Sequence, residues 1–137
     1  ALRDVEIAVA VNENHKALLA AWYVNTGDTA RAKRVFGEVV SLAPRGYWSP
    51  TTLAAASYWL GKGVRLESAL SQEKDAGERA FAYCCLGRID EAYTALEREY
   101  ANRPRDLAKR INTPWLVFLK RDPRYKKLLA KAGIEER

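Results

Sequence analysis

The hydrophobic residues of the chain recur at helical spacing. In residues 17–25 they cover most of a helical circumference, which is typical of a helix that packs on two sides. The next segment places its apolar residues along one helical face, namely Ala32, Val35, Phe36, Val39 and Val40. This pattern predicts two neighbouring helices and, with the same spacing elsewhere, an all-α domain.

A Gly-Asp pair separates the two predicted helices. Gly27 supplies the left-handed backbone conformation that commonly ends a helix. Asp28 is expected to cap the next helix, because its carboxylate can accept hydrogen bonds from the free amides of the first turn. Pro44 stops the second helix. The segment therefore predicts an antiparallel helix pair joined by a very short turn.

The same order of small, aromatic and turn residues returns later in the chain. Residues 79–104 repeat it, and the numbering offset between matched positions is the same throughout. The matched pairs are Ala20 with Ala80, Tyr23 with Tyr83, Gly27 with Gly87, Ala32 with Ala92, Phe36 with Leu96, and Pro44 with Pro104. Each pair keeps the size and type of its residue, so the chain contains an internal repeat.

These residues resemble the tetratricopeptide repeat, a helix-turn-helix unit of about 34 residues that closes with a proline. Small residues at the crossing points, such as Ala20 and Ala32, let two helix axes approach closely. The resemblance implies a right-handed stack of antiparallel helix pairs, which is an α-solenoid, with a helical cap at its C-terminal end. It also implies a protein–protein interaction scaffold that binds a peptide or a partner helix in its concave groove.

The middle of the chain is expected to hold a shortened helix pair. Two full units would separate equivalent residues by about 68 positions, and the offset from Gly27 to Gly87 is smaller than that. Ser49-Pro50 is a helix-start signal and Gly61 lies at a break, so this section predicts two helices that together lack about two turns. We expect a single domain over residues 1–137, made of a partial unit 1–11, a repeat 13–46, a degenerate repeat 47–72, a repeat 73–106 and capping helices 107–137.

The C-terminal segment is expected to cap the stack. Pro114 and Pro123 each mark a helix start, with Thr113 and Asp122 as the expected capping residues. Residues 122–129, DPRYKKLL, are similar to the segment that often follows the last repeat in bacterial regulators of this family. The chain also begins within a predicted helix. We therefore expect it to belong to a larger bacterial-type protein or complex, with an open N-terminal helix that could support self-association.

Composition and candidate chemistry point away from catalysis. Hydrophobic residues make up 48% and charged residues 29% of the chain, and no apolar run approaches the roughly 20 residues of a membrane helix. Cys84 and Cys85 are adjacent, cannot pair within a helix, and are expected to be small buried residues of a cytoplasmic protein. His15 is the single histidine, and the chain has no glycine-rich phosphate loop. We expect no catalytic residue, no metal site, no cofactor and no membrane contact.

The resemblance implies which residues line the concave groove, because the first helix of each pair faces it. The lining is mostly apolar and would suit an apolar helix or an extended segment. The expected groove residues are Ala17, Ala21, Val24, Asn25, Tyr58, Lys74, Glu78, Phe81 and Cys84, with Thr51 and Ala55 as further candidates. Asn25 and Lys74 alone could grip a terminal carboxylate. The alternative interpretation is that Tyr58 and Phe81 simply pack between repeats.

Charge adds a second candidate surface. The net charge is +6, and residues 101–137 hold eleven Lys and Arg against four Asp and Glu. The basic patch comprises Arg103, Arg105, Lys109, Arg110, Lys120, Arg121, Arg124, Lys126, Lys127 and Lys131. Such a density could neutralise phosphates and bind nucleic acid or another anionic surface in a salt-dependent way. It could equally contact an acidic protein, or form the solvated face of the cap.

Overall fold

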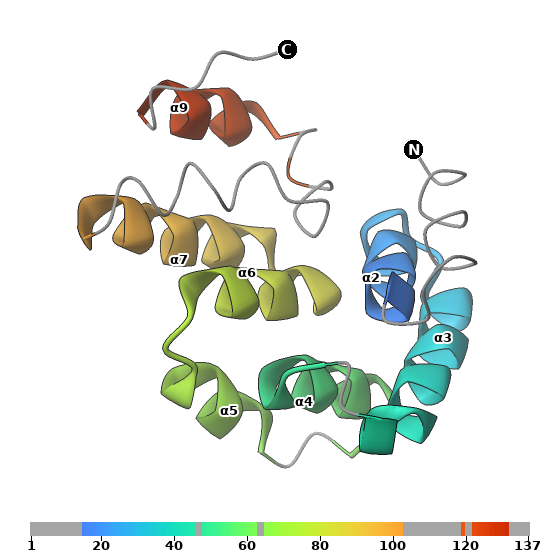
Figure 1. The fold of residues 1–137 in the computed structure, drawn as a ribbon. Helices are drawn as coiled ribbons and strands as arrows, with labels where there is room; N and C mark the ends of the chain where they lie inside the picture. The colour runs from blue at the N-terminus through green and yellow to red at the C-terminus, as the bar shows by residue number, and fades with distance from the viewer. Residues whose placement is uncertain (1–14, 46–47, 63–64, 103–118, 120–121, 132–137) are drawn as a thin grey trace.

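Helices form every element of the structure, a computed structural model that describes residues 15–45, 48–62, 65–102, 119 and 122–131 (Figure 1). Its elements, in chain order, are α2 (Lys16–Asn25), α3 (Thr29–Ser41), the short 3-10 helix η2 (Ala43–Arg45), α4 (Pro50–Trp59), α5 (Leu66–Gln72), α6 (Ala76–Cys85), α7 (Ile89–Asn102) and α9 (Pro123–Lys131). No strand occurs within the described ranges, so the all-α prediction is confirmed there. None of the described helices has the length and apolarity to cross a membrane.

Two helix pairs repeat the same architecture. α2 packs against α3, and α6 packs against α7. The first helix of each pair occupies the matched positions of the internal repeat, 16–25 in one copy and 76–85 in the other. Both turns close with the same backbone hydrogen bond, from Asp28 N to Tyr23 O at 2.9 Å and from Arg88 N to Tyr83 O at 2.8 Å. The sequence repeat therefore corresponds to a repeated hairpin.

A glycine in the left-handed region follows three of the helices. Gly27, Gly61 and Gly87 have φ values of 86°, 77° and 75°, a region that favours glycine. Lys62 N donates to Ser57 O at 2.9 Å, which repeats at the end of α4 the closure found after α2 and α6. The chain from Gly61 to Gly87 is shorter than the chain from Gly27 to Gly61. The residues missing from the middle repeat therefore lie after α4.

The missing residues shorten α5. This helix contains 7 residues, whereas α3 contains 13 and α7 contains 14. At about 3.6 residues per turn, the deficit is about two turns. The structure thus has the helix pair and the shortening that the sequence predicts for residues 47–72, while the predicted partial unit 1–11 lies outside the described residues.

Within the described residues, capping side chains are found where the sequence predicts them, with one addition, while the predicted cap Thr113 lies outside those residues. Asp28 Oδ1 accepts from Arg31 N, and Ser49 Oγ accepts from Thr52 N, each at 3.2 Å. The addition is Asp75, whose carboxylate accepts from a first-turn amide of α6 at 2.9 Å. Each cap supplies an acceptor for one of the amides that a helix start leaves unbonded.

Small residues lie at the centre of both hairpins. Ala20 and Ala32 in the first hairpin, and Ala80 and Ala92 in the second, are all fully buried. Because a methyl group occupies little space, the helix axes of each pair can approach closely. These four positions are the matched small residues of the internal repeat, so their agreement in size between the two copies has a packing explanation.

Trp59, at the end of α4, joins the two hairpins. Its ring stacks on Phe36 of α3, with the ring centroids 6.2 Å apart and the planes 5° from parallel. Its Nε1–H donates to Cys85 O, at the end of α6, at 2.8 Å. The same side chain thus supplies apolar contact to one hairpin and a hydrogen bond to the other.

α2 also lies directly against α6. Asn25 Nδ2 donates to Cys84 O at 2.9 Å, as well as to Ala21 O of its own helix at 2.7 Å. A Cβ placed on Gly87 would lie 3.3 Å from Val24 Cγ1. In a regular stack the first helix of the middle pair separates those of its two neighbours, because each unit contacts only the next. The α2–α6 contact therefore departs from regular stacking.

α9 packs on α7. Tyr125 and Leu128 on α9 are buried. Tyr93 on α7 donates its hydroxyl hydrogen to Leu119 O at 2.8 Å. α9 thus covers part of α7, while the predicted helix start at residues 113–114 lies outside the described residues and the capping role of the C-terminal segment stays a prediction.

Candidate functional site

Six of the eleven residues named for the groove are buried. The buried members are Ala17, Ala21, Phe81 and Cys84, and with them the further candidates Thr51 and Ala55. None of these residues exposes more than 5% of its surface. The helices α2, α4 and α6 carry them, and α6 packs directly against both of the others. The open groove expected from the resemblance is therefore not formed by these side chains.

The remaining groove candidates divide into engaged and exposed side chains. Val24 is partly buried against the core, and the amide of Asn25 is bonded to two carbonyl oxygens. Asn25 is thus already committed to helix packing and not directed at a ligand. Tyr58, Lys74 and Glu78 are exposed, Tyr58 with 47% of its surface accessible. Contact of these three with a partner stays a prediction.

The two cysteines are free, buried thiols. Burial raises the pKa of Cys84 and of Cys85 above the ordinary value of 9.0, and the pKa of Cys85 is raised further by the charges of Cys84 and Glu78. The thiolate, which is the reactive and metal-binding form, is therefore disfavoured. Within the described ranges no three His, Cys, Asp or Glu side chains are grouped to hold a metal ion. The placement agrees with the interpretation of both cysteines as small buried residues.

Part of the basic patch falls within α9. Arg124, Lys126, Lys127 and Lys131 belong to this helix, and Lys126 and Lys127 are exposed. The other members lie outside the described residues: Arg103, Arg105, Lys109, Arg110, Lys120 and Arg121. Binding of an anionic polymer by this patch stays a prediction.

Arg124 is engaged by surface contacts within the chain. Its guanidinium lies 2.7 Å from Asp90 Oδ1 and 2.7 Å from Asp122 Oδ2, and it stands 4.5 Å above the ring of Tyr93. Hydrogen bonds from Arg124 lower the pKa of the Asp122 carboxyl. Arg124 thus joins α9 to α7, and a phosphate could bind it only by displacing these carboxylates.

One cavity opens beside the α2–α3 hairpin. Its volume is about 400 Å³, and it is lined by Lys16, Arg34, Gly37, Glu38, Ser41 and Leu42. Lys16 Nζ and Glu38 Oε2 lie 3.3 Å apart. Two of the three charges in the lining therefore neutralise each other.

A second cavity lies between α6 and α7, and the sequence did not predict it. Its volume is about 220 Å³, and it is lined by Arg79, Tyr83, Glu91, Thr94, Ala95 and Arg98. Two guanidinium groups and one carboxylate give this lining a net charge of +1. We refer to this cavity as the Arg79–Arg98 pocket.

Arg79 brings a buried donor to the pocket. Its Nη2 donates to the carbonyl oxygen of Glu73, which follows α5. Its Nε atom is buried and has no hydrogen-bond partner in the described part of the chain. The carboxylate of Glu73 is bonded elsewhere, since it accepts from Thr51 Oγ1 at 2.6 Å and from Asp75 N at 3.0 Å. Arg79 is therefore held by a neutral carbonyl and keeps an unused N–H.

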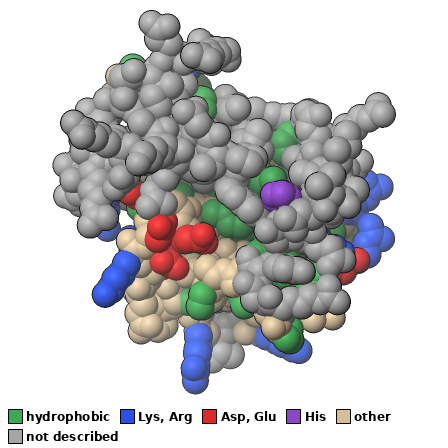
Figure 2. Space-filling model, viewed as in Figure 1, with side chains coloured by type: hydrophobic (Ala, Val, Ile, Leu, Met, Phe, Trp, Pro, Cys, Tyr) green, Lys and Arg blue, Asp and Glu red, His purple; other side chains and the backbone are tan. Residues whose placement is uncertain are grey.

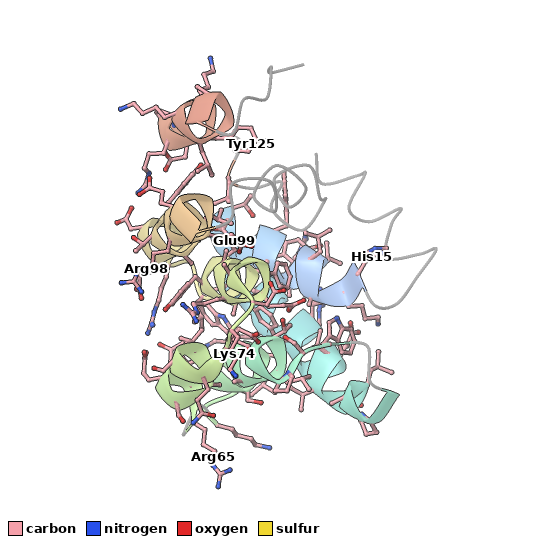
Figure 3. The ribbon with its side chains drawn as sticks, turned by 60° about the vertical axis from the view of Figure 1, so that its left-hand side comes forward. His15, Arg65, Lys74, Arg98, Glu99 and Tyr125 are labelled. Carbon is pink, nitrogen blue, oxygen red and sulfur yellow. The ribbon has the colours of Figure 1, made fainter. Side chains whose placement is uncertain are left out.

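The other two donors of the pocket are unused as well. Across the described residues, the guanidinium of Arg98 and the hydroxyl of Tyr83 make no hydrogen bond or ion pair. Arg98 is exposed and projects outward from α7 (Figure 3). Glu91 lies 3.8 Å from Arg88 Nε, so its charge is partly matched outside the pocket. One small cavity is thus lined by three residues that each keep a donor without an acceptor in the described part of the chain.

The short α5 leaves this side of the hairpin less covered. α3 packs along α4, whereas the corresponding helix α5 has much less contact with α6 and α7. Side chains bridge the separation at two points, where Arg88 Nη1 contacts Glu67 Oε1 at 2.9 Å and where Arg79 reaches the carbonyl of Glu73. Because α5 is about two turns shorter than α3, it covers less of its neighbour.

A signal for the pocket exists in the sequence repeat. Under the offset that matches Ala20 with Ala80, Arg79 corresponds to Leu19 and Arg98 corresponds to Glu38. Leu19 packs against the core. An arginine at a position that is apolar in the other copy indicates either a buried partner or a ligand. A comparison of the two repeat copies, looking for positions that are apolar in one and charged in the other, would have pointed to Arg79 and so to the pocket.

Acidic side chains gather near the start of α6. Figure 2 shows them on one face, over the connection between α5 and α6. Glu73 and Asp75 precede this helix, and Glu78 lies in its first turn. Carboxylates at this end of a helix offset the dipoles of the exposed amides. The cluster therefore has a structural explanation, and it surrounds the approach to α6 with negative charge.

The chain was compared with protein-family models, with curated proteins and with solved structures, and no match was found. The chemistry of the site follows from its donors. Guanidinium and phenol groups without acceptors, in a cavity of net charge +1, suit an anionic group of low charge.

Proposed function

We propose that the protein is an interaction module of the tetratricopeptide type, within a larger bacterial-type protein or complex, and that it binds a segment of a partner protein. The observation that carries the proposal is the Arg79–Arg98 pocket, where unused donors lie on the α6–α7 hairpin within the described residues. A surface that is formed before the partner arrives limits the entropy lost on association. The proposed mechanism is binding, not catalysis.

The packing of α6 supports this proposal. α2, α4 and α7 all pack against this helix. Asn25 and Trp59 donate to its last carbonyl oxygens at 2.9 Å and 2.8 Å. A helix held in this way can position its side chains more reproducibly than a loop can. Arg79 and Tyr83 therefore stand on a well-supported element.

Tyr58 supplies an exposed aromatic side chain near the same hairpin. It is 47% exposed and contacts Trp59 edge-on, with ring centroids 5.9 Å apart. The pKa of Arg88, in the turn between α6 and α7, is raised chiefly by its hydrogen bond with Glu67 and to a smaller degree by Tyr58. Exposed tyrosines are enriched at protein interfaces. Tyr58 is the proposed second contact for the partner.

Site-specific photo-crosslinking tests the proposed function. A photoreactive residue is placed at Glu97, the exposed neighbour of Arg98 on α7, in the full chain and in the cells that produce the protein. The matched control is the same residue at Lys33, an exposed cation on α3. We expect position 97 to yield discrete protein adducts that survive nuclease treatment, and position 33 to yield none of the same adducts.

Two results would contradict the proposed function. The first is the absence of adducts at position 97, or the same adducts at positions 97 and 33. The second is a set of adducts that disappears with nuclease and forms instead from Lys126 or Lys127, the exposed described members of the basic patch. That second result would favour the nucleic-acid alternative.

A further inference from the structure

We propose that the Arg79–Arg98 pocket takes the side-chain carboxylate of an acidic residue in the partner protein, held by Arg79, Tyr83 and Arg98. This inference rests on the proposed function and specifies the chemistry of its recognition.

The pocket residues Arg79, Arg98 and Tyr83 have hydrogen-bond donors that lack an acceptor among the described residues. Arg79 Nε is buried without an acceptor in the described part of the chain, and the Arg98 guanidinium and Tyr83 hydroxyl have none there either. The desolvation cost of the buried N–H is already present in the unbound protein. A ligand that supplies an acceptor at this point therefore gains a hydrogen bond without incurring that cost again.

Charge decides between the possible anions. The pocket lining has two arginines and one glutamate, and therefore a net charge of +1. A carboxylate carries a single negative charge and matches this balance. A phosphate monoester carries roughly 1.5 to 2 negative charges near neutral pH and would meet repulsion from Glu91 on the same wall. The acidic side chains near the start of α6 add to that repulsion.

Shape supports the same choice. A guanidinium presents its N–H groups in one plane, a geometry that matches the two oxygens of a carboxylate. The pocket volume of about 220 Å³ is below the roughly 300–1,000 Å³ of sites that enclose small-molecule ligands. It corresponds to about seven water molecules, which is enough for one side chain. The buried Ala95 supplies an apolar wall for the methylene groups of such a side chain.

The remaining polar atoms of the pocket suit a peptide as the carrier of the carboxylate. Glu91 is an acceptor on the wall of the pocket, and Thr94 donates its own hydroxyl hydrogen to Asp90 O at 3.1 Å. Both side-chain oxygens are therefore able to accept from a peptide N–H. A free small anion would leave these acceptors without use, whereas an acidic residue within a peptide offers both the carboxylate and neighbouring amides.

The first hairpin provides a natural contrast. Its residues at the positions of Arg79 and Arg98 are Leu19 and Glu38. Glu38 is paired with Lys16 at 3.3 Å. Two arginines at these two positions are thus found only in the second of the two described copies, and the proposed recognition is expected there.

A titration followed by NMR tests this proposal on the full chain labelled with ¹⁵N. The probe is a short, capped alanine peptide with one central glutamate, and the control peptide has glutamine at that position. We expect the Nε–H signals of Arg79 and Arg98 to shift in a saturable way with the glutamate peptide only. A dissociation constant on the order of 1 mM is the expected scale for a single anchoring side chain. The Nε–H signal of Arg34, on α3, should not move.

Three variants test which side chains determine the affinity for the glutamate peptide. Arg98→Gln removes an exposed guanidinium and should leave the thermal unfolding midpoint unchanged, while the affinity for the glutamate peptide falls about tenfold or more. Arg34→Gln makes the same chemical change on the first hairpin and should leave the affinity unchanged. Tyr83→Phe removes only the hydroxyl and should lower the affinity by a smaller factor.

The proposal is overturned by any of three results. These are equal binding of the glutamate and glutamine peptides, unchanged affinity in Arg98→Gln, and tighter binding of a phosphoserine peptide than of the glutamate peptide. The two proposals fail separately. Protein adducts at position 97 without peptide binding would overturn the carboxylate assignment and leave the interaction function standing. Saturable peptide binding without any adduct would overturn the interaction function and leave the carboxylate chemistry of the pocket standing.

Discussion

Cys84 and Cys85 have two separate roles in the packing of α6. Their carbonyl oxygens accept the side-chain hydrogen bonds from Asn25 and Trp59 that join α2 and α4 to this helix. Their thiols have no exposed surface, and a thiol behaves as a small apolar group in such a position. At the scale of the residue, the adjacent cysteines are explained by packing alone.

The buried thiols should make stability fall in alkaline solution. Burial raises the pKa of Cys84 and Cys85 above 9.0, so the folded protein keeps protons that the unfolded chain releases. Their contribution to stability is complete below pH 9 and is lost as the pH rises above it. Because each thiol ionises in the unfolded chain but not in the folded protein, the free energy of unfolding should fall by about 1.4 kcal/mol per thiol between pH 8 and pH 10.

Urea unfolding at the two pH values, in the presence of a reductant, measures this effect. The control is the double variant Cys84→Ala, Cys85→Ala, which retains every other titrating group. We expect the double variant to lose less stability than the original chain over this interval. Identical losses in the two proteins would show that the thiols ionise as readily in the folded state as in the unfolded one.

At the scale of the element, the two hairpin turns share a backbone conformation but differ in their surroundings. Gly27 and Gly87 both have positive φ values, 86° and 75°. A Cβ at position 27 would meet no atom within 4 Å, whereas one at position 87 would lie 3.3 Å from Val24 Cγ1 on α2. The second turn is therefore also part of the contact between the hairpins.

Alanine at these glycines should separate the two effects. Gly27→Ala should destabilise the protein by about 1–2 kcal/mol, because alanine is strained at positive φ. Gly87→Ala should cost about 1 kcal/mol more, since Val24 must move to admit the new methyl group. Denaturant unfolding of both variants gives the comparison. Equal losses of stability would indicate that α2 does not press on the second turn.

Much of the element structure could be predicted because its causes are local. Asp28 and Ser49 cap helices through first-turn amides, and the glycine after a helix is set by its own φ. The shortening of α5 followed from the spacing between the repeats. The α2–α6 contact depends on how helices that are far apart in the sequence pack beside the short α5. No local sequence pattern specifies such packing. The pocket was missed although the repeat carries a signal for it, an arginine at position 79 where the first copy has Leu19.

At the scale of the molecule, the short α5 changes where a partner can bind. A regular stack of helix pairs would present its first helices along a groove. Here α2 and α6 meet, and the predicted groove residues Ala17, Ala21, Phe81 and Cys84 are buried between the helices of the described core. The outer side of the α6–α7 hairpin is less covered and holds the Arg79–Arg98 pocket. The proposed binding surface therefore lies on the α6–α7 hairpin and not in the groove that the resemblance implies.

The direct contact between α2 and α6 is the central claim of this account, and a nuclear Overhauser measurement tests it most directly. The account predicts cross-peaks between the Val24 methyl groups and the α-protons of Gly87, together with slow exchange of the Asn25 side-chain amide that bonds to Cys84 O. A regular stack with an open groove would separate these groups. Absence of the cross-peaks, with a rapidly exchanging Asn25 amide, would contradict the account.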